Sequence, residues 1–374
     1  MSKRSLAVAG AAALSLLLAA CGSSSSTSTT TAPAASGGST SAPAAAGKVG
    51  VILPDSASSN RWETADRKFL TDAFKAAGVE ADIQNANGDK AKFATLCDQF
   101  VSGGVKVLMI VNLDSDTGKA CESKATAQGI KTIDYDRLTL GGGASYYVSF
   151  DNVAVGTAQG EGLVKCMQAN GKKTGGVILL NGSPTDNNAT LFKQGYEAAI
   201  KAAGYTIAAD QSVPDWDNTK AGTIFEQIFA STKDFVGVDA ANDGLGGAVI
   251  AVLAKNGLAG KIPVTGQDAT DSGLQNVLLG TQCMTVYKAI KKEAEAASGL
   301  AIALIAGDTA KADSLATGKT ADSVTGKDVP SVLLVPQGIF ADTVKDVIAD
   351  GFTTVDKICT TAELKAACTK NGVA

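Results

Sequence analysis

The chain has 374 residues, a formal net charge of −4 and no histidine. This length allows two domains of ordinary size, and a hydrophobic content of 45% allows full cores. The charge argues against a nucleic-acid partner. The lack of histidine removes the commonest general base and the commonest zinc ligand, so we expect no catalytic residues, no cofactor and no metal site.

The first 21 residues have the pattern of an export signal. Lys3 and Arg4 precede a short apolar run that ends in small residues before Cys21. This site resembles a bacterial lipoprotein signal, which implies that Cys21 becomes the first mature residue and carries lipid. The alternative is a transmembrane anchor, for which the run is short. Residues 22–47 are almost wholly Ser, Thr, Ala, Gly and Pro, so we expect a flexible tether that holds an extracytoplasmic domain to the outer face of the cell membrane.

From residue 48 onward, short β-branched runs alternate with longer helical patterns. The first series predicts strands at 49–53, 80–84, 105–111, 131–135 and 146–150, with helices at 62–77, at 89–101 and up to about 128. The second predicts helices at 153–170, 191–203, 221–230 and 247–256, with strands at 176–180, 205–209, 236–240 and 262–266. Two such series indicate an α/β protein with two doubly wound parallel-sheet lobes.

The remaining segment is too small for a third domain. It contains an extended stretch at 285–287, a helix at 288–305, a polar stretch at 307–327, a strand at 332–335 and a helix at 340–349. We expect it to cross to the first lobe and return, which makes a three-segment hinge near 150–152, 284–288 and 330–336. The N-terminal lobe would then comprise 48–151 and 287–329, and the C-terminal lobe 152–286 and 330–374.

Six cysteines remain besides Cys21, and an even number in an exported chain suggests disulfides. Proximity along the sequence favours Cys97–Cys121 and Cys359–Cys368, which leaves Cys166–Cys283. Six cysteines allow 15 connectivities, and some could instead be buried thiols.

Ligands of open α/β sheets bind beyond the carboxyl ends of the strands. The predicted strands are followed there by Arg61 and Trp62, by Asp136 and Arg137, by Asp186 and Asn188, by Trp216, by Asn242 and by Asp268. This set suits a sugar, because aromatic rings cover its C–H faces while carboxylates, guanidiniums and amides bond its hydroxyls. Bonds to charged groups contribute about 1.5–3 kcal/mol each, against about 0.5–1.5 for neutral ones.

Each residue also has a plainer interpretation. Asp136 and Arg137 could form a surface ion pair, and Trp62 and Trp216 could belong to the core. Asn242 or Asp243 could cap the following helix, and Asp268 could do the same.

At these positions the chain resembles the periplasmic sugar-binding proteins of ABC importers, and most closely their D-xylose-binding branch. The matching segments are Arg61-Trp62, Ala86-Asn87-Gly88, Tyr135-Asp136-Arg137, Ser149-Phe150-Asp151-Asn152, Gly182-Ser183-Pro184, Asp186-Asn187-Asn188-Ala189, Asn242-Asp243, Gly266-Gln267-Asp268-Ala269 and Met284-Thr285-Val286-Tyr287-Lys288. The resemblance implies a type I periplasmic binding protein fold that closes on a monosaccharide. It assigns sugar contacts to the residues named above and adds Lys288 beside the hinge, which could otherwise be a helix-start lysine.

The resemblance also implies a monomer that delivers a xylose-like pentose or glucose-like hexose to the membrane subunits of an ABC permease. The chain departs from the family in its six non-lipid cysteines, in the tail beyond Phe352 and in a small polar loop before Trp62. Three alternatives remain: a sensor that presents sugar to a membrane receptor, a glycosidase, and a sugar-responsive repressor. A repressor needs a DNA-binding motif where the tether lies, and a glycosidase needs a carboxyl of raised pKa, which Arg and Lys nearby oppose.

Overall fold

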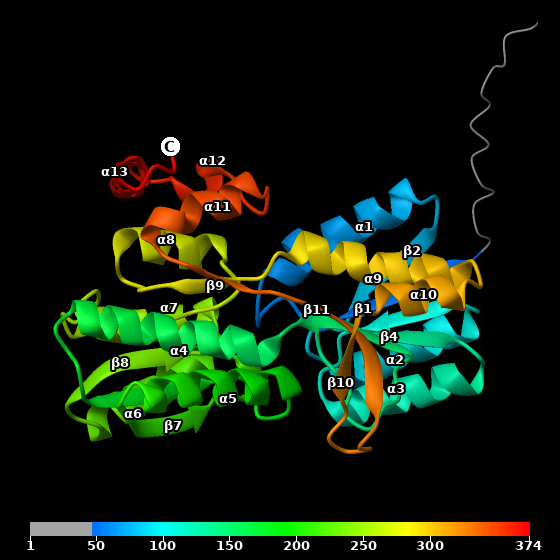
Figure 1. Ribbon diagram of the computed structural model, residues 1–374, viewed down its shortest axis with the longest axis horizontal. Coiled ribbons are helices and arrows are strands. Elements are labelled where there is room, and N and C mark those ends of the chain that lie inside the picture. The colour runs from blue at the N-terminus through cyan, green and yellow to red at the C-terminus, as the bar shows by residue number, and fades with distance from the viewer. Residues whose placement is uncertain (1–46) are drawn as a thin grey trace, which may run out of the picture. The chain divides into compact units, whose positions relative to one another are not determined.

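The computed structural model describes residues 47–374, so the predictions for Cys21 and for the tether up to residue 46 lie outside the described residues. Two mainly parallel sheets organise this region (Figure 1), which confirms the predicted α/β fold. We call the seven-stranded sheet with its helices the first lobe. The second lobe contains a three-stranded sheet and a two-stranded one.

The first lobe has the strand order β10-β11-β5-β4-β3-β1-β2, in which only β10 is antiparallel to its neighbour. Its strands are β1 (Lys48–Leu53), β2 (Glu80–Asn85), β3 (Val107–Ile110), β4 (Lys131–Tyr135), β5 (Tyr146–Phe150), β10 (Gly318–Ala321) and β11 (Asp328–Leu334). Its helices are η1 (Trp62–Asp66), α1 (Arg67–Ala76), α2 (Lys90–Ser102), α3 (Ser115–Ala127), α9 (Ile290–Ile305) and α10 (Thr309–Leu315).

Alternate residues of each central strand of the first lobe enter two different cores. Val49 and Val51 of β1 pack with α1 and α9, whereas Ile52 packs with α2 and α3. Helices therefore cover both faces of the sheet, and its central strands are apolar on both sides, as is expected of a parallel sheet.

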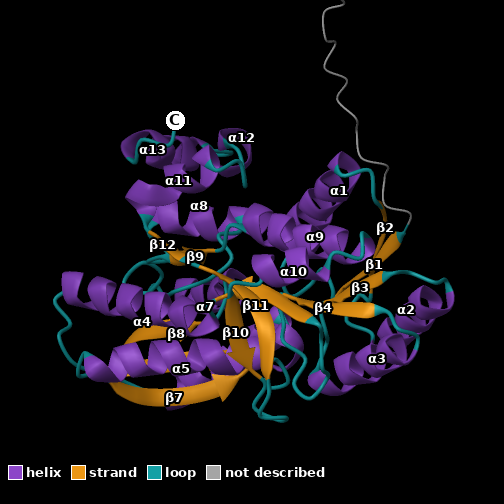
Figure 2. Ribbon diagram, turned by 45° about the vertical axis from the view of Figure 1, so that its right-hand side comes forward, coloured by secondary structure: helices purple, strands orange, loops and turns teal. Residues whose placement is uncertain are grey.

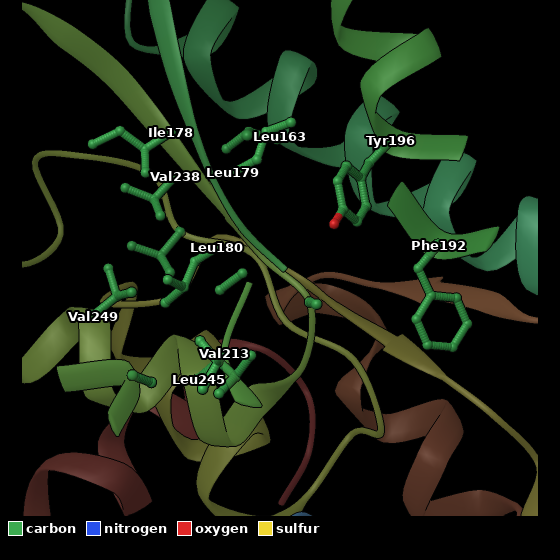
Figure 3. Packing of buried hydrophobic residues seen from close by; sticks show 14 of the residues in the cluster. Leu163, Ile178, Leu179, Leu180, Phe192, Tyr196, Val213, Val238, Leu245 and Val249 are labelled. Carbon is green, nitrogen blue, oxygen red and sulfur yellow. The ribbon is translucent and has the colours of Figure 1, made fainter. Parts of the chain in front are cut away.

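The second lobe has the strand order β7-β6-β8, and the short strands β9 and β12 pair beside it. Its strands are β6 (Gly176–Asn181), β7 (Thr206–Ser212), β8 (Phe235–Ala240), β9 (Thr285–Tyr287) and β12 (Gln337–Ile339). Its longer helices are α4 (Asn152–Ala169), α5 (Asn187–Ala202), α6 (Asn218–Ser231) and α7 (Asp243–Lys255), with the short η2 (Pro214–Trp216) before α6. Figure 3 shows side chains of β6 and β8 packed among Leu163 of α4, Phe192 and Tyr196 of α5, and Val249 of α7.

A smaller core lies at the far end of the second lobe. It joins α8 (Asp271–Leu279) to η3 (Ala341–Thr343), α11 (Val344–Ala349), α12 (Val355–Ile358) and α13 (Ala362–Lys370) (Figure 2). Leu274 and Val277 of α8 are buried there with Ile358 and Leu364 of the last two helices. No helix between residues 47 and 374 combines the length and apolar character needed to cross a membrane.

Several predicted elements differ from the structure. Residues 262–266 form no strand, and only Val264 bridges to β8, because Pro263 has no N–H to donate to a ladder. The helices α5, α6 and α7 begin before their predicted starts, at polar N-caps that apolar periodicity does not register. The predicted helix at 62–77 begins with one π-helical turn, and α8 and α10 were not predicted.

The chain passes between the two sheets after β5, after β9 and after β11 (Figure 1). The lobe boundaries stay a prediction. The chain was expected to return to the second lobe at residue 330, but β11 pairs with β5 of the first lobe up to Leu334.

The structure contains the disulfides Cys97–Cys121, Cys166–Cys283 and Cys359–Cys368, which confirms the predicted pairing. Cys166–Cys283 joins the end of α4 to the segment before β9 across 117 residues, whereas Cys359–Cys368 spans 9. The longer loop restricts the unfolded chain more strongly.

We predict that replacing Cys166 and Cys283 together by alanine destabilises the protein more than the same change at Cys359 and Cys368. Loop entropy gives losses of about 4.9 and about 2.6 kcal/mol for the two pairs. Urea denaturation followed by circular dichroism would measure both, and the wild-type protein is the reference. Equal losses, or a larger loss at Cys359 and Cys368, would contradict the loop-length argument.

Candidate functional site

The predicted binding residues converge on one cavity between the two lobes. All of them except Asp136 line it, and the lining set is Arg61, Trp62, Arg137, Asp186, Asn188, Trp216, Asn242, Asp268 and Lys288. Asp136 lies directly behind it, in contact with Arg61, Asn188 and Lys288. The structure thus gathers these residues, while their contact with a ligand stays a prediction.

The start of α5 places Asp186 at the cavity. Its Oδ1 caps the helix by accepting the backbone N–H of Asn188 at 2.9 Å. Its Oδ2 accepts the Trp216 Nε1–H at 3.0 Å and lies 3.0 Å from Arg137 Nε, which comes from the first lobe. One carboxylate therefore anchors a helix, a tryptophan and the opposite lobe.

The start of α7 uses Asn242 in the same way. Its Oδ1 accepts the backbone N–H of Leu245 at 2.9 Å, and its Nδ2 donates to the backbone oxygen of Ser58 across the lobes at 3.2 Å. Its neighbour Asp243 is buried and bonds to Thr270 and to other side chains of its own lobe. Asn242 is therefore the cap that the sequence left undecided.

Three residues at or behind the cavity have an unusual backbone conformation. Asp136, Trp216 and Asp268 adopt positive φ angles of 64°, 55° and 94°. Such conformations cost about 1–3 kcal/mol in non-glycine residues and are concentrated at functional sites. Gly182 makes room for one of them, because a Cβ there would lie 2.1 Å from the Trp216 ring.

Arg61 is buried in a cluster of carboxylates. Its Nε and Nη2 donate to Asp66 at 3.1 Å each, and Nη2 also donates to Asp136 at 2.9 Å and to Glu293 at 3.3 Å. Its Nη1 lies 3.9 Å from Asp268 of the second lobe. These carboxylates outweigh the cost of burial and raise the pKa of Arg61 well above its usual range, so the guanidinium stays charged.

Asp136 is the centre of the polar network. Its carboxylate lies 2.9 Å from Arg61 Nη2 and 3.6 Å from Lys288 Nζ, and it accepts the Asn188 Nδ2–H at 3.2 Å. Burial opposes its ionisation, but Lys288, Arg61 and Arg137 outweigh burial and lower the pKa of Asp136 to about 2. Asp136 is therefore an ionised acceptor at neutral pH.

The aromatic residues have different surroundings. Both guanidiniums lie over the Trp62 ring, Arg61 at 4.1 Å and Arg137 at 5.6 Å from its centroid, so Trp62 positions the arginines by cation–π contact. Trp216 meets Phe192 edge-on, with 6.5 Å between ring centroids. Trp216 and Phe192 supply the apolar part of the cavity wall on the side of the second lobe.

Sequence reasoning missed several residues of the site. Phe192 follows Asn188 by one helical turn and therefore shares its face of α5, a signal that could have identified it. Ser58, Ser59 and Gln267 also line the cavity. Asp66 and Glu293 lie behind Arg61. Asp66 follows Arg61 by five residues, whereas Glu293 is 232 residues away, so no local pattern marks Glu293.

Three residues that line the cavity each carry a polar atom without a hydrogen-bond partner in the described structure. Among residues 47–374, the buried Ser59 Oγ, Arg61 Nη1 and Gln267 Oε1 have no hydrogen-bond partner. They offer a hydroxyl, a donor and an acceptor to the same space. The cavity itself measures about 30 Å³, because side chains of the two lobes contact each other across it.

The side chains that line the cavity can make hydrogen bonds and aromatic contacts. Burial raises the pKa of Glu293 well above its usual range, and Asp136 adds to this effect, but Glu293 does not line the cavity. In the described part of the chain, no group of three or more His, Cys, Asp or Glu residues is arranged to hold a metal ion.

The chain is similar to periplasmic binding proteins over most of its length. The family described as periplasmic binding protein domain matches residues 49–309. The D-xylose-binding periplasmic protein of Escherichia coli is 33% identical over 82% of this chain and 90% of its own length. A multiple sugar-binding periplasmic receptor of Rhizobium radiobacter is 30% identical, with coverage of 82% and 91%.

A solved structure shows the same fold. The ABC transporter solute-binding protein of Clostridium phytofermentans, with bound β-D-glucose, superposes with a TM-score of 0.73 at 27% identity. The match covers 83% of this chain and 99% of that one.

We predict that Asp136 makes the stability of the folded protein depend on acid pH. An unfolded aspartate has a pKa of about 3.9, above the value of about 2 for folded Asp136. Ionised Asp136 therefore stabilises the fold above about pH 4, and this contribution disappears as the pH falls through about 2.

The stability difference between wild type and Asp136→Asn should accordingly shrink between pH 4 and pH 2, measured by denaturant unfolding. Asp98→Asn, which removes an exposed ion pair with Lys124, is the control. A difference that is independent of pH would show that ionised Asp136 is not stabilised in this way.

Proposed function

This chain belongs to the periplasmic sugar-binding proteins of ABC importers, and from that premise we propose that it captures a monosaccharide by closure of its two lobes and delivers it to an ABC permease. The protein acts as a monomer outside the cytoplasm. Lipid on Cys21 and the tether of residues 22–47 hold it to the outer face of the cell membrane.

One observation supports a sugar as the ligand. Ser59, Arg61 and Gln267 line one cavity together with Trp216 and Phe192, and the buried Oγ, Nη1 and Oε1 atoms of these three residues have no hydrogen-bond partner within residues 47–374. A sugar hydroxyl is both donor and acceptor, so it can satisfy each of these atoms, and the rings suit its C–H faces. An apolar ligand would leave all three unpaired, at about 1–3 kcal/mol each.

Contacts between the lobes support the proposed closure. Arg137–Asp186, Asn242–Ser58 and Lys288–Asp268 join residues of different lobes or of the hinge, at 3.0, 3.2 and 3.2 Å. The cavity of about 30 Å³ has room for about two water molecules, so a sugar enters only when the lobes separate. Because a sugar bonds to both lobes only when they are closed, it shifts the population toward the closed form, which then docks on the permease.

The ligand class is a xylose-like pentose or a glucose-like hexose. The relative from Escherichia coli is named for D-xylose, and the solved relative from Clostridium phytofermentans holds glucose. Charged groups on both lobes offer bonds of about 1.5–3 kcal/mol to a neutral hydroxyl, which suits tight binding of a small uncharged sugar.

Two other roles are distinguishable by experiment. A sensor role is favoured by the relative named as a periplasmic receptor, and a transport assay in cells that lack this protein separates import from sensing. A glycosidase would release the leaving group of an aryl glycoside. We expect no release, because Asp136 is held ionised and Glu293 does not face the cavity.

We predict that Trp216→Ala weakens binding of the preferred monosaccharide at least about tenfold, or about 1.4 kcal/mol. The substitution removes the ring that lines the cavity and leaves Asp186 without its Nε1–H partner. Calorimetry with D-xylose, D-glucose and D-ribose would first identify the sugar and then compare the variant. Unchanged affinity in a folded variant would exclude Trp216 from the site.

We predict that Asp268→Ala also weakens sugar binding at least about tenfold, with little change in the melting temperature of the sugar-free protein. In the described structure its carboxylate contacts Lys288 and Arg61, both of which keep other carboxylate partners. Asp72→Ala is the matched control, because Asp72 is an exposed aspartate on α1 paired with Lys68. A large fall in melting temperature with intact affinity would instead assign Asp268 a structural role.

A further inference from the structure

A second, larger cavity adjoins the first. It has a volume of about 440 Å³ and shares Ser58, Ser59, Arg61 and Asp268 with the inner cavity. We propose that this outer cavity binds a second sugar ring linked to the one in the inner cavity, so that the ligand class includes disaccharides. The inference rests on the proposed sugar-binding function and extends its substrate class.

The outer cavity has the chemistry that a sugar ring needs. Phe352 provides an aromatic surface, and Asn60, Asn218, Gln275 and Ser272 provide amide and hydroxyl groups. Amides and hydroxyls both donate and accept, as the hydroxyls of a neutral sugar require. Its volume falls within the range of about 300–1,000 Å³ that small-molecule sites occupy.

The wall between the two cavities carries groups that can bond to a linked ligand. Ser59 Oγ and Arg61 Nη1 are buried without a hydrogen-bond partner among residues 47–374, and both residues line both cavities. A glycosidic oxygen and the hydroxyls beside it would lie at this boundary. A monosaccharide in the inner cavity alone leaves the outer cavity to solvent.

The C-terminal segment builds the outer wall. Gln275 Nε2 on α8 donates to the backbone oxygens of Lys357 and Ile358 at 3.1 and 3.2 Å, and Thr353 Oγ1 donates to Asp271 at 2.5 Å. Cys359–Cys368 closes the segment immediately afterwards, and Ile358 is fully buried against α8. Lys357 is thereby held at the outer cavity.

Calorimetry with matched sugars tests the proposal. The probes are D-xylose with xylobiose and D-glucose with cellobiose. For the pair whose monosaccharide binds, we expect the disaccharide to bind with an affinity within about tenfold of it. Ser272→Trp places a bulky side chain in the outer cavity and should weaken disaccharide binding at least about tenfold while leaving monosaccharide binding unchanged.

Matched variants separate the outer cavity from general effects. Ser314→Trp, at an exposed serine on α10 of the first lobe, should change neither affinity. Lys357→Ala, a smaller change at an exposed side chain, should weaken only the disaccharide. If Ser272→Trp does not fold, this second variant still decides the question.

The binding measurements distinguish failure of the disaccharide inference from failure of the proposed function. A protein that binds the monosaccharide but neither disaccharide would overturn the inference and leave the proposed function intact. Equal weakening of both sugars by Ser272→Trp, or no effect of Lys357→Ala on the disaccharide, would also overturn it. A protein that binds none of the four sugars would overturn the proposed function itself.

Discussion

The structure depends on the pairing of buried charges where the two lobes meet. Arg61, Lys288 and Asp136 are almost completely buried, and an isolated charge in such a place would be unstable. Each is therefore held among opposite charges and hydrogen-bonding groups. Because Lys288 lies at the hinge and Asp268 on the second lobe, this pairing joins the lobes as well as the site.

The fold explains why these charges meet. Parallel strands present their carboxyl ends at one edge, and the helices that follow need a polar residue at each start. Asp186 and Asn242 meet that need with one atom and face the cavity with another. The same residues thus stabilise the helices and shape the site, so part of the binding chemistry comes from ordinary helix capping.

The C-terminal helices form part of the second lobe. Its α12 and α13 pack on α8 and are closed by Cys359–Cys368. Phe352 and Lys357 of this segment line the outer cavity between the lobes. The C-terminal segment therefore contributes to the outer cavity, whereas no residue of it lines the inner one.

The sequence by itself determined the alternation of strands and helices and the strand ends at which Asp136 and Trp216 stand. It favoured the disulfide pairing, which the structure contains. Those features follow from local periodicity and from proximity along the chain. Tertiary structure alone decided that Asn242 rather than Asp243 is the cap, whereas Pro263 already argued in the sequence against the predicted strand at 262–266.

Only the folded chain also places Glu293 and Asp66 behind Arg61 and leaves Ser59 and Gln267 with unpaired atoms at the cavity. The physical reason is that hydrogen-bond partners of buried charges are chosen by distances across the folded chain. Hydrophobic periodicity reports only which side of an element is buried.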